Sequence, residues 1–421
     1  MVHRGLVTGG AFMNKVLMVT YFFPPIASVG VFRTLKFAKY LPRFGWKPVI
    51  LTVKNPDHSM VKSDPHYAED RLSGVKVFRS YSVPLGWMYK IHRLGISHKW
   101  FVIPDIFIGW LRSTVSLGKK IVAKERIDVI YASCPPATSL VIGALLKRIT
   151  RKPLVVDYRD PWTNNPFTSY PTRVHYSIEK KIENRILRNC DVIITTTEFQ
   201  KQELLKAFPF LRETDVHVIT NGYDPDDFLD IEHRKSDKFT IVHAGTIYGP
   251  RAKHFGMFFK ALGGLLRRGK IPDFRIVLIG NMPPSTERDL SKLVQESDLT
   301  TQVHYLGQKS HREAIQFIFS ADLLLLIPGS PVFISGKVFE YLAARRFILN
   351  ISDPTSETAG IISRAKAGIT VEPNVELLQE ALHEVFALDN AESRENEEFL
   401  SKFSRMRLTE NLASVLDKLV R

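Results

Sequence analysis

A cluster of acidic, basic and aromatic side chains follows directly after an apolar run of strand length. The segment VVDYRDPW (155–162) contains Asp157, Arg159, Asp160 and Trp162. Two carboxylates beside a guanidinium at the end of a strand suit the orientation of substrate hydroxyls or contact with an anionic group. They equally suit a purely structural role, in which Asp157 or Asp160 forms an ion pair with Arg159 and Trp162 packs over the pair. The sequence leaves both interpretations open.

Two other strand-end segments of the first half share an unusual, small and proline-containing composition. YFFPPIASVG (21–30) ends in Gly30, which lets a ligand approach the backbone at the head of the next helix. ASCPPATS (132–139) has the same character. Together with DYRDPW (157–162), they predict three loops that converge at one edge of a sheet.

A turn in the second half has the composition of a phosphate-binding site. In IVHAGTIYGPR (241–251), Gly245 and Thr246 follow an apolar strand, and Arg251 follows the turn. Backbone N–H groups and a helix start would attract a phosphate there, and the arginine adds a cation. The alternative is an ordinary tight turn.

A second candidate in this half is SGKVFEYLAA (335–344). Lys337 and Glu340 are three residues apart and therefore share a helix face. A lysine in the first turn of a helix opposes the helix dipole unless an anion lies beside it. The alternative is a surface ion pair between the two side chains.

Composition narrows the class of protein. The 421 residues carry a formal net charge of +15, which predicts an acidic partner or surface. The two cysteines and the scattered histidines predict no metal site. Aromatic residues are not interleaved with the basic residues as they are in a nucleic-acid-binding module.

No apolar run is long enough to span a bilayer, and a cytoplasmic location is expected. The basic residues form three sets in the first half, Arg33, Lys36, Lys39, Arg43 and Lys47; Lys147, Arg148, Arg151 and Lys152; and Lys180, Lys181, Arg185 and Arg188.

Short apolar runs alternate with helical periodicity along the whole chain, which predicts α/β domains with parallel sheets. Pro, Gly and acidic residues at 221–228 interrupt the series. We expect a Rossmann-like domain over 13–222, a second over 223–398, and an amphipathic C-terminal helix over 399–421 that returns towards the first domain. The expected strands are 15–22, 47–53, 75–80, 128–133, 153–158 and 191–197, then 239–245, 274–280, 302–307, 321–328, 346–352 and 367–372.

These motifs, in this order, resemble the GT-B glycosyltransferases, and specifically retaining family 4 in its bacterial polysaccharide and lipopolysaccharide branch. The resemblance spans about Lys15 to the C-terminus and includes PP…R, SCPP, DYRDPW, NGYD, AGTIYG and GKVFEYLAA. It implies two Rossmann-like domains facing across a cleft, and a hexosyltransferase. The donor would be a UDP- or GDP-sugar, and the acceptor a saccharide or lipid-linked sugar. No cofactor or metal would be needed.

The resemblance also implies roles for single residues. Gly245, Thr246 and Arg251 match the donor-phosphate turn, Lys337 a position near the diphosphate, and Glu340 the ribose ligand. In the first domain, Asp160 would orient an acceptor hydroxyl and Arg159 would face the donor phosphates. Gly30, Asp157 and Trp162 would complete the acceptor side.

One position departs from the family. Val332 stands where family 4 carries its first glutamate, which contacts the donor sugar. The loss of this glutamate gives weight to a non-catalytic basic scaffold that kept the fold. A UDP-sugar 2-epimerase with the same fold is a second alternative, but it would need acids and histidines that move protons in the cleft, and only Asp157 and Asp160 are obvious. The basic first half and the Trp- and Phe-rich segment 84–110 predict a peripheral protein on an anionic membrane surface, or else a packed insertion.

Overall fold

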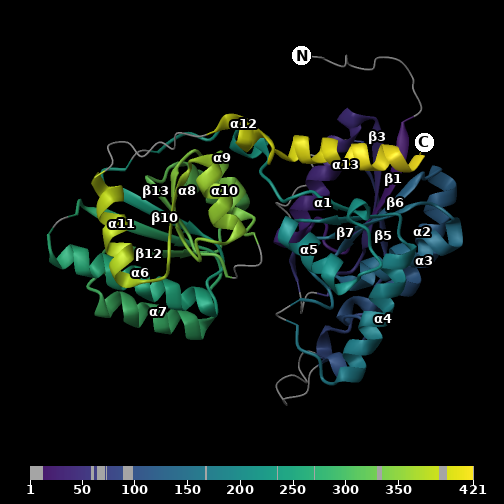
Figure 1. Ribbon diagram of the computed structural model, residues 1–421, viewed down its shortest axis with the longest axis horizontal. Coiled ribbons are helices and arrows are strands. Elements are labelled where there is room, and N and C mark those ends of the chain that lie inside the picture. The colour runs from purple at the N-terminus through teal and green to yellow at the C-terminus, as the bar shows by residue number, and fades with distance from the viewer. Residues whose placement is uncertain are drawn as a thin grey trace. The chain divides into compact units, whose positions relative to one another are not determined.

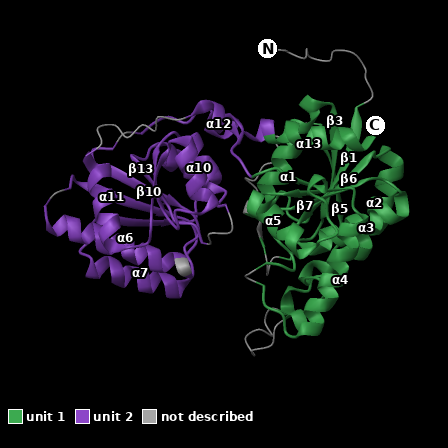
Figure 2. Cartoon of the chain, in the orientation of Figure 1, with its two compact units in different colours: residues 1–220, 408–421 green, residues 221–407 purple. Residues whose placement is uncertain are grey.

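The chain folds into two compact units, shown by the computed structural model in Figures 1 and 2. Unit 1 comprises residues 1–220 and 408–421, and unit 2 comprises residues 221–407. The structure describes residues 13–57, 61–63, 72, 74–88, 98–165, 168–234, 236–269, 271–329, 334–387 and 396–420. No helix in these ranges is long and apolar enough to cross a membrane.

Unit 1 is built on a seven-stranded sheet of order β5-β3-β1-β6-β7-β8-β9. All of its pairings are parallel. The strand order reverses between β1 and β6, and ligands of open α/β sheets bind beyond the carboxyl ends of the strands at such a switch point. The strands are β1 (Asn14–Val19), β3 (Trp46–Val53), β5 (Lys76–Ser80), β6 (Val129–Cys134), β7 (Leu154–Tyr158), β8 (Val192–Thr195) and β9 (Val216–Val218). A short pair, β2 (Ile26–Ala27) and β4 (Lys62–Ser63), lies outside this sheet.

The apolar runs bury both faces of this sheet. In β1, Leu17 and Val19 belong to one hydrophobic cluster, whereas Val16 and Met18 belong to a second cluster on the other face. Alternate side chains of a strand point to opposite faces, so a strand covered on both sides must be apolar throughout. The covering helices are α1 (Val29–Tyr40), α2 (Leu111–Glu125), α3 (Ala137–Thr150), α4 (Arg173–Asn189), α5 (Glu198–Ala207) and α13 (Arg405–Val420).

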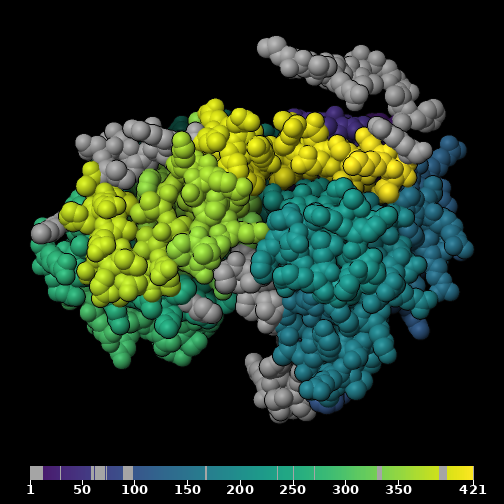
Figure 3. Space-filling model, viewed as in Figure 1, coloured from purple at the N-terminus to yellow at the C-terminus, as the bar shows by residue number. Residues whose placement is uncertain are grey.

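The C-terminal helix completes the core of unit 1. Leu408, Leu412, Val415 and Leu416 of α13 are buried in the cluster that contains Val16 and Met18. The Trp46 indole also donates a 2.8 Å hydrogen bond to Asp417. Figure 3 shows this helix, in yellow, lying along the surface of unit 1. The tail is a short helix, α12 (Glu397–Ser401), followed by α13, rather than the single continuous helix that the spacing predicts.

Unit 2 contains a six-stranded sheet of order β12-β11-β10-β13-β14-β15, again with parallel pairing throughout. Its switch point lies between β10 and β13. The strands are β10 (Phe239–Ala244), β11 (Phe274–Ile279), β12 (Val303–Gly307), β13 (Leu323–Leu326), β14 (Phe347–Ile351) and β15 (Gly368–Val371). The helices are α6 (Pro250–Arg267), α7 (Pro284–Glu296), α8 (His311–Phe319), α9 (Lys337–Ala343), α10 (Glu357–Ala365), α11 (Val375–Ala387) and α12.

The predicted α/β class with two parallel sheets is confirmed. Each expected strand overlaps an observed one, and the prediction missed β9, which has three residues, and the two-residue strands β2 and β4. The segment predicted as a linker is anchored within unit 2. There the Tyr223 N–H donates to the Phe403 carbonyl, and the Arg405 N–H donates to the Tyr223 carbonyl.

Candidate functional site

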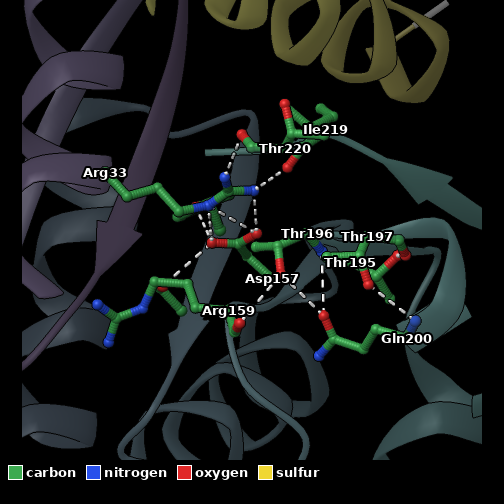
Figure 4. A network of polar contacts seen from close by, with 11 residues as sticks. Arg33, Asp157, Arg159, Thr195, Thr196, Thr197, Gln200, Ile219 and Thr220 are labelled. Carbon is green, nitrogen blue, oxygen red and sulfur yellow. Dashed lines mark hydrogen bonds and ion pairs between the residues drawn. The ribbon is translucent and has the colours of Figure 1, made fainter. Parts of the chain in front are cut away.

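The acid–base cluster after β7 is centred on an ion pair that the sequence does not suggest. The Asp157 carboxylate lies 2.8 Å from the Arg33 guanidinium, and both side chains are almost fully buried (Figure 4). Arg33 also donates to the carbonyls of Ile219 and Thr220. The expectation that Asp157 or Asp160 pairs with Arg159 is wrong for Asp157, whose ion-pair partner is Arg33 of α1.

Further donors hold the Asp157 carboxylate in place. The hydroxyls of Tyr131 and Ser133, both in β6, donate to it. Burial by itself would raise the pKa of Asp157, but the charge and hydrogen bonds of Arg33 outweigh burial and lower it. Asp157 is therefore a buried, fully satisfied carboxylate, which is the structural role that the sequence left open. Its burial leaves no surface for an acceptor, contrary to the expected place on the acceptor side.

Arg159 joins the three strand-end loops at the switch point of unit 1. It donates one 2.6 Å hydrogen bond to the carbonyl of Gly30, after β1, and another to the carbonyl of Pro135, after β6. A Cβ atom at residue 30 would lie 2.4 Å from the Arg159 guanidinium. The small residue at position 30 thus makes room for Arg159 rather than for a ligand. The predicted convergence of three loops is present.

Asp160 is the exposed end of this cluster. It is only partly buried, whereas Arg159 and Trp162 are each less than 10 % exposed. Burial raises the pKa of the Asp160 carboxyl, Arg159 lowers it, and Asp157 raises it further. Of the five residues predicted for the acceptor side, Gly30, Asp157, Arg159, Asp160 and Trp162, Asp160 is the one that combines a carboxyl group with partial access to solvent.

Two buried glutamates of α4 position the loop that carries Asp160. The Trp162 indole donates to Glu179 over 2.7 Å, and the Thr163 hydroxyl donates to Glu183. Both glutamates are about 1 % exposed, and burial raises the pKa of each. They lie four residues apart on one helix face, a spacing that could have indicated this role in the sequence.

In unit 2, the predicted phosphate turn lies at the end of β10. The Arg251 guanidinium donates to the carbonyl of Thr246 over 2.7 Å. A Cβ atom at Gly329, just beyond β13, would lie 2.9 Å from the Arg251 Nε atom. Arg251 therefore lies between the ends of β10 and β13, at the switch point of unit 2.

Lys337 and Glu340 lie beyond the end of β13, in α9. The Lys337 ammonium is 2.7 Å from the Glu340 carboxylate, and the side chains are 25 % and 17 % exposed. Burial by itself would raise the pKa of Glu340, but Lys337 chiefly, with His311, lowers it. The pair is more enclosed than a surface ion pair. Gly336 is the N-terminal cap residue of α9. Val332, the position that departs from the family, lies outside the described residues.

His243, in β10, is a further polar residue of this site. It is 3 % exposed, and burial, together with the charges of Arg251 and Lys337, lowers its pKa to about 4. Its Nδ1 atom lies 2.9 Å from the Leu325 carbonyl, which only accepts, so Nδ1 carries the proton. The Nε2 atom is consequently an acceptor, and it is buried without a hydrogen-bond partner.

The two cations and one carboxylate of unit 2 suit a ligand that combines negative charge with hydroxyl groups. No cluster of metal-ligating side chains is present in the described part of the chain. In both units, the candidate residues lie where the strand order reverses, which is the position that open α/β sheets use for ligands.

Two parallel α/β units with this strand order define the GT-B fold, and the chain has that fold. Residues 31–227, a little under half of the chain, match the model of Glycosyltransferase Family 4. The family match and the fold together support a glycosyltransferase that resembles family 4. No curated protein matches the sequence.

Solved structures with this fold are distant in sequence. A glycosyltransferase from Rickettsia africae ESF-5 is 17% identical with a TM-score of 0.66, over 97% of this chain and 99% of that one. Sucrose-phosphate synthase from Thermosynechococcus elongatus is 16% identical with a TM-score of 0.67, over 96% and 99%. Anabaena HepE in complex with UDP and glucose is 15% identical with a TM-score of 0.66, over 96% and 100%.

Proposed function

We propose that the protein is a hexosyltransferase that moves a sugar from a nucleotide-sugar donor to a saccharide or lipid-linked acceptor, with retention of configuration. Its setting is bacterial cell-surface polysaccharide synthesis at the cytoplasmic face of the membrane. The observation that carries the proposal is the gathering of Arg251, Lys337 and Glu340 at the switch point of unit 2. The Glycosyltransferase Family 4 match over residues 31–227 supports it independently.

Unit 2 holds the donor in this proposal. Arg251 and Lys337 bind the diphosphate, Gly245 and Thr246 supply the turn beside it, and Glu340 accepts hydrogen bonds from the ribose hydroxyls. The lowered pKa of Glu340 keeps it ionised, so that both carboxylate oxygens can accept. A uridine nucleotide is the first choice, because the HepE structure of the same fold contains UDP.

Unit 1 supplies the acceptor side through the loop after β7. Asp160 orients an acceptor hydroxyl, and its partial exposure suits that task. Arg159 acts indirectly, because its guanidinium already donates to the carbonyls of Gly30 and Pro135 and thereby fixes the loop. Trp162 has the same supporting role through Glu179.

The proposed reaction requires stabilisation of the charge on the leaving diphosphate, and it needs no nucleophile from the enzyme. As the bond between the sugar and the diphosphate breaks, negative charge grows on the diphosphate, and Lys337 and Arg251 stabilise it. The diphosphate then accepts the proton of the attacking hydroxyl on the same face of the sugar. The enzyme contributes orientation of both substrates.

A nucleotide-release assay with a panel of UDP- and GDP-sugars tests the proposal. We expect UDP release only when an acceptor is present, and Lys337→Ala should reduce it by at least about 100-fold, as loss of a charge-stabilising group does. Lys260→Ala, an exposed lysine of α6, is the matched control and should keep full activity.

Near-normal turnover of Lys337→Ala would refute the diphosphate assignment. Interconversion of the donor sugar without an acceptor would instead establish the 2-epimerase. A scaffold would show no rise in melting temperature with any nucleotide.

A further inference from the structure

The outer face of α4 is an exposed stripe with an apolar end and a basic end. Five of the exposed residues of α4 follow spacings of four, three, four and three residues, which places them on one side of the helix. They are Val174, Ile178, Lys181, Arg185 and Arg188. Val174 is 64% exposed and Ile178 is 40% exposed, which is unusual for branched aliphatic side chains of a helix that packs on a sheet.

Aromatic side chains extend the apolar end. Trp100, in a short 3-10 helix (His98–Trp100), is 50% exposed, and its ring lies 5.1 Å from the ring of His175 in α4. Phe101, the next residue, is 60% exposed. Large exposed apolar residues that cluster in this way mark an interaction site rather than ordinary surface.

The basic end is not neutralised by neighbouring acids. Within the described ranges, Lys181 and Arg185 have no ion-pair partner. Arg188 stacks on the Phe210 ring at 3.8 Å and donates to the neutral side chain of Asn184, so its charge also stays uncompensated. We call the apolar end and the basic end together the docking surface, which consists of Trp100, Phe101, Val174, Ile178, Lys181, Arg185 and Arg188.

The inner face of the same helix holds the loop that carries Asp160. Glu179 accepts from Trp162, and Glu183 accepts from Thr163 and, at 3.1 Å, from Tyr158. One rigid helix thus connects the docking surface to the loop after β7.

We propose that the docking surface seats unit 1 on an anionic lipid bilayer. The apolar end enters the headgroup region, and the cations of the basic end meet lipid phosphates. A bilayer explains both ends of the stripe, whereas a nucleic acid would use only the cations. The inference rests on the proposed function in one respect, the delivery of a lipid-linked acceptor to the loop that α4 holds.

Co-sedimentation of the full chain with vesicles tests the surface. We expect binding to phosphatidylcholine vesicles that contain phosphatidylglycerol, weakened by salt. Each cation at an anionic leaflet contributes about a fivefold gain in partitioning, so Lys181→Gln with Arg185→Gln should lower partitioning by about 25-fold. The matched control is Lys119→Gln with Lys120→Gln, two exposed lysines of α2 in the same unit, which should change partitioning by less than about twofold.

The apolar end is tested separately at high salt, where surface electrostatics are screened. Val174→Ser with Ile178→Ser should abolish the binding that remains there, and an unchanged melting temperature shows that unit 1 is still folded. Equal losses in the α2 control and the α4 variant would overturn the proposal. So would tighter binding to duplex DNA than to the anionic vesicles.

These vesicle measurements contain no nucleotide sugar, so they are independent of transfer. A chain that transfers no sugar but shows the expected variant pattern would refute the proposed function and uphold the docking surface. A chain that transfers sugar but ignores anionic vesicles would do the reverse.

Discussion

The buried pair of Arg33 and Asp157 gives the sharpest prediction about how unit 1 is held together. Asp157→Asn removes the negative charge but keeps the volume, which leaves the Arg33 guanidinium, 1% exposed, with neutral acceptors only: the amide oxygen at 157 and the carbonyls of Ile219 and Thr220. Breaking a buried pair from one side costs about 3–5 kcal/mol. A domain is stable by about 5–15 kcal/mol, so unit 1 should lose a large part of its stability.

A double-mutant cycle separates the pair from its surroundings. Arg33→Met alone should also destabilise, because it leaves Asp157 buried with only Tyr131 and Ser133 as hydrogen-bond donors. The two changes together should cost less than the sum of the single changes, by about 2–3 kcal/mol, because neither charge is then left alone.

Tryptophan fluorescence during urea unfolding is the assay, because it reports on unit 1 alone. The sequence has five tryptophans, Trp46, Trp87, Trp100, Trp110 and Trp162, and all precede residue 220. The control is Lys206→Met, which removes an exposed ion pair with Glu203 in the same unit and should cost less than about 1 kcal/mol. The reasoning fails if Asp157→Asn costs no more than this control, or if the two changes of the cycle are additive.

Three further predictions concern the same loops. Gly30→Ala should destabilise unit 1 in urea unfolding and lower transfer, because its Cβ would displace the Arg159 guanidinium; an unaltered stability would contradict the close approach. Asp160→Asn should lower kcat for transfer without lowering the melting temperature, and a loss of both together would indicate a structural role instead. Burial raises the folded-state pKa of Glu183 above its unfolded value of about 4.3, so the stabilisation that goes with its protonation is full below that pH and is lost as the pH rises through the folded pKa. Hydrogen exchange of α4, corrected for its intrinsic rate, should therefore be slower at mildly acidic than at neutral pH, and Glu183→Gln should remove the difference; equal protection of the wild type at both values would rule this out.

Much of the site was predictable because strand-end loops of parallel sheets meet at one edge. The apolar runs located β1, β6 and β7, and the composition after each run indicated that the loops converge. The same logic located Gly245, Arg251, Lys337 and Glu340 at the ends of β10 and β13. Their roles towards a ligand stay predictions, to be tested by the transfer assay.

Other residues of the site could not be found in this way. His243 occupies a strand position typical of core residues, and only the fold brings Arg251 and Lys337 close enough to lower its pKa. Arg33 and Lys36 were expected on an electropositive face, but they are 1% and 5% exposed. A helical spacing that carries cations does not reveal which of them point into the protein.

The sequence by itself determined the local elements, since a continuous apolar run of strand length is typical of a strand buried on both faces, and the glycine- and proline-rich segments after several runs are typical of turns. It also determined which charged residues stand at the ends of those strands. Only the tertiary structure decided how they pair. Asp157 meets Arg33, 124 positions away, instead of its neighbour Arg159, because the register of β1, β6 and β7 brings α1 over the end of β7. Arg159 is thereby left to bind the three loops together, and Asp160 stays partly exposed at the end of the cluster.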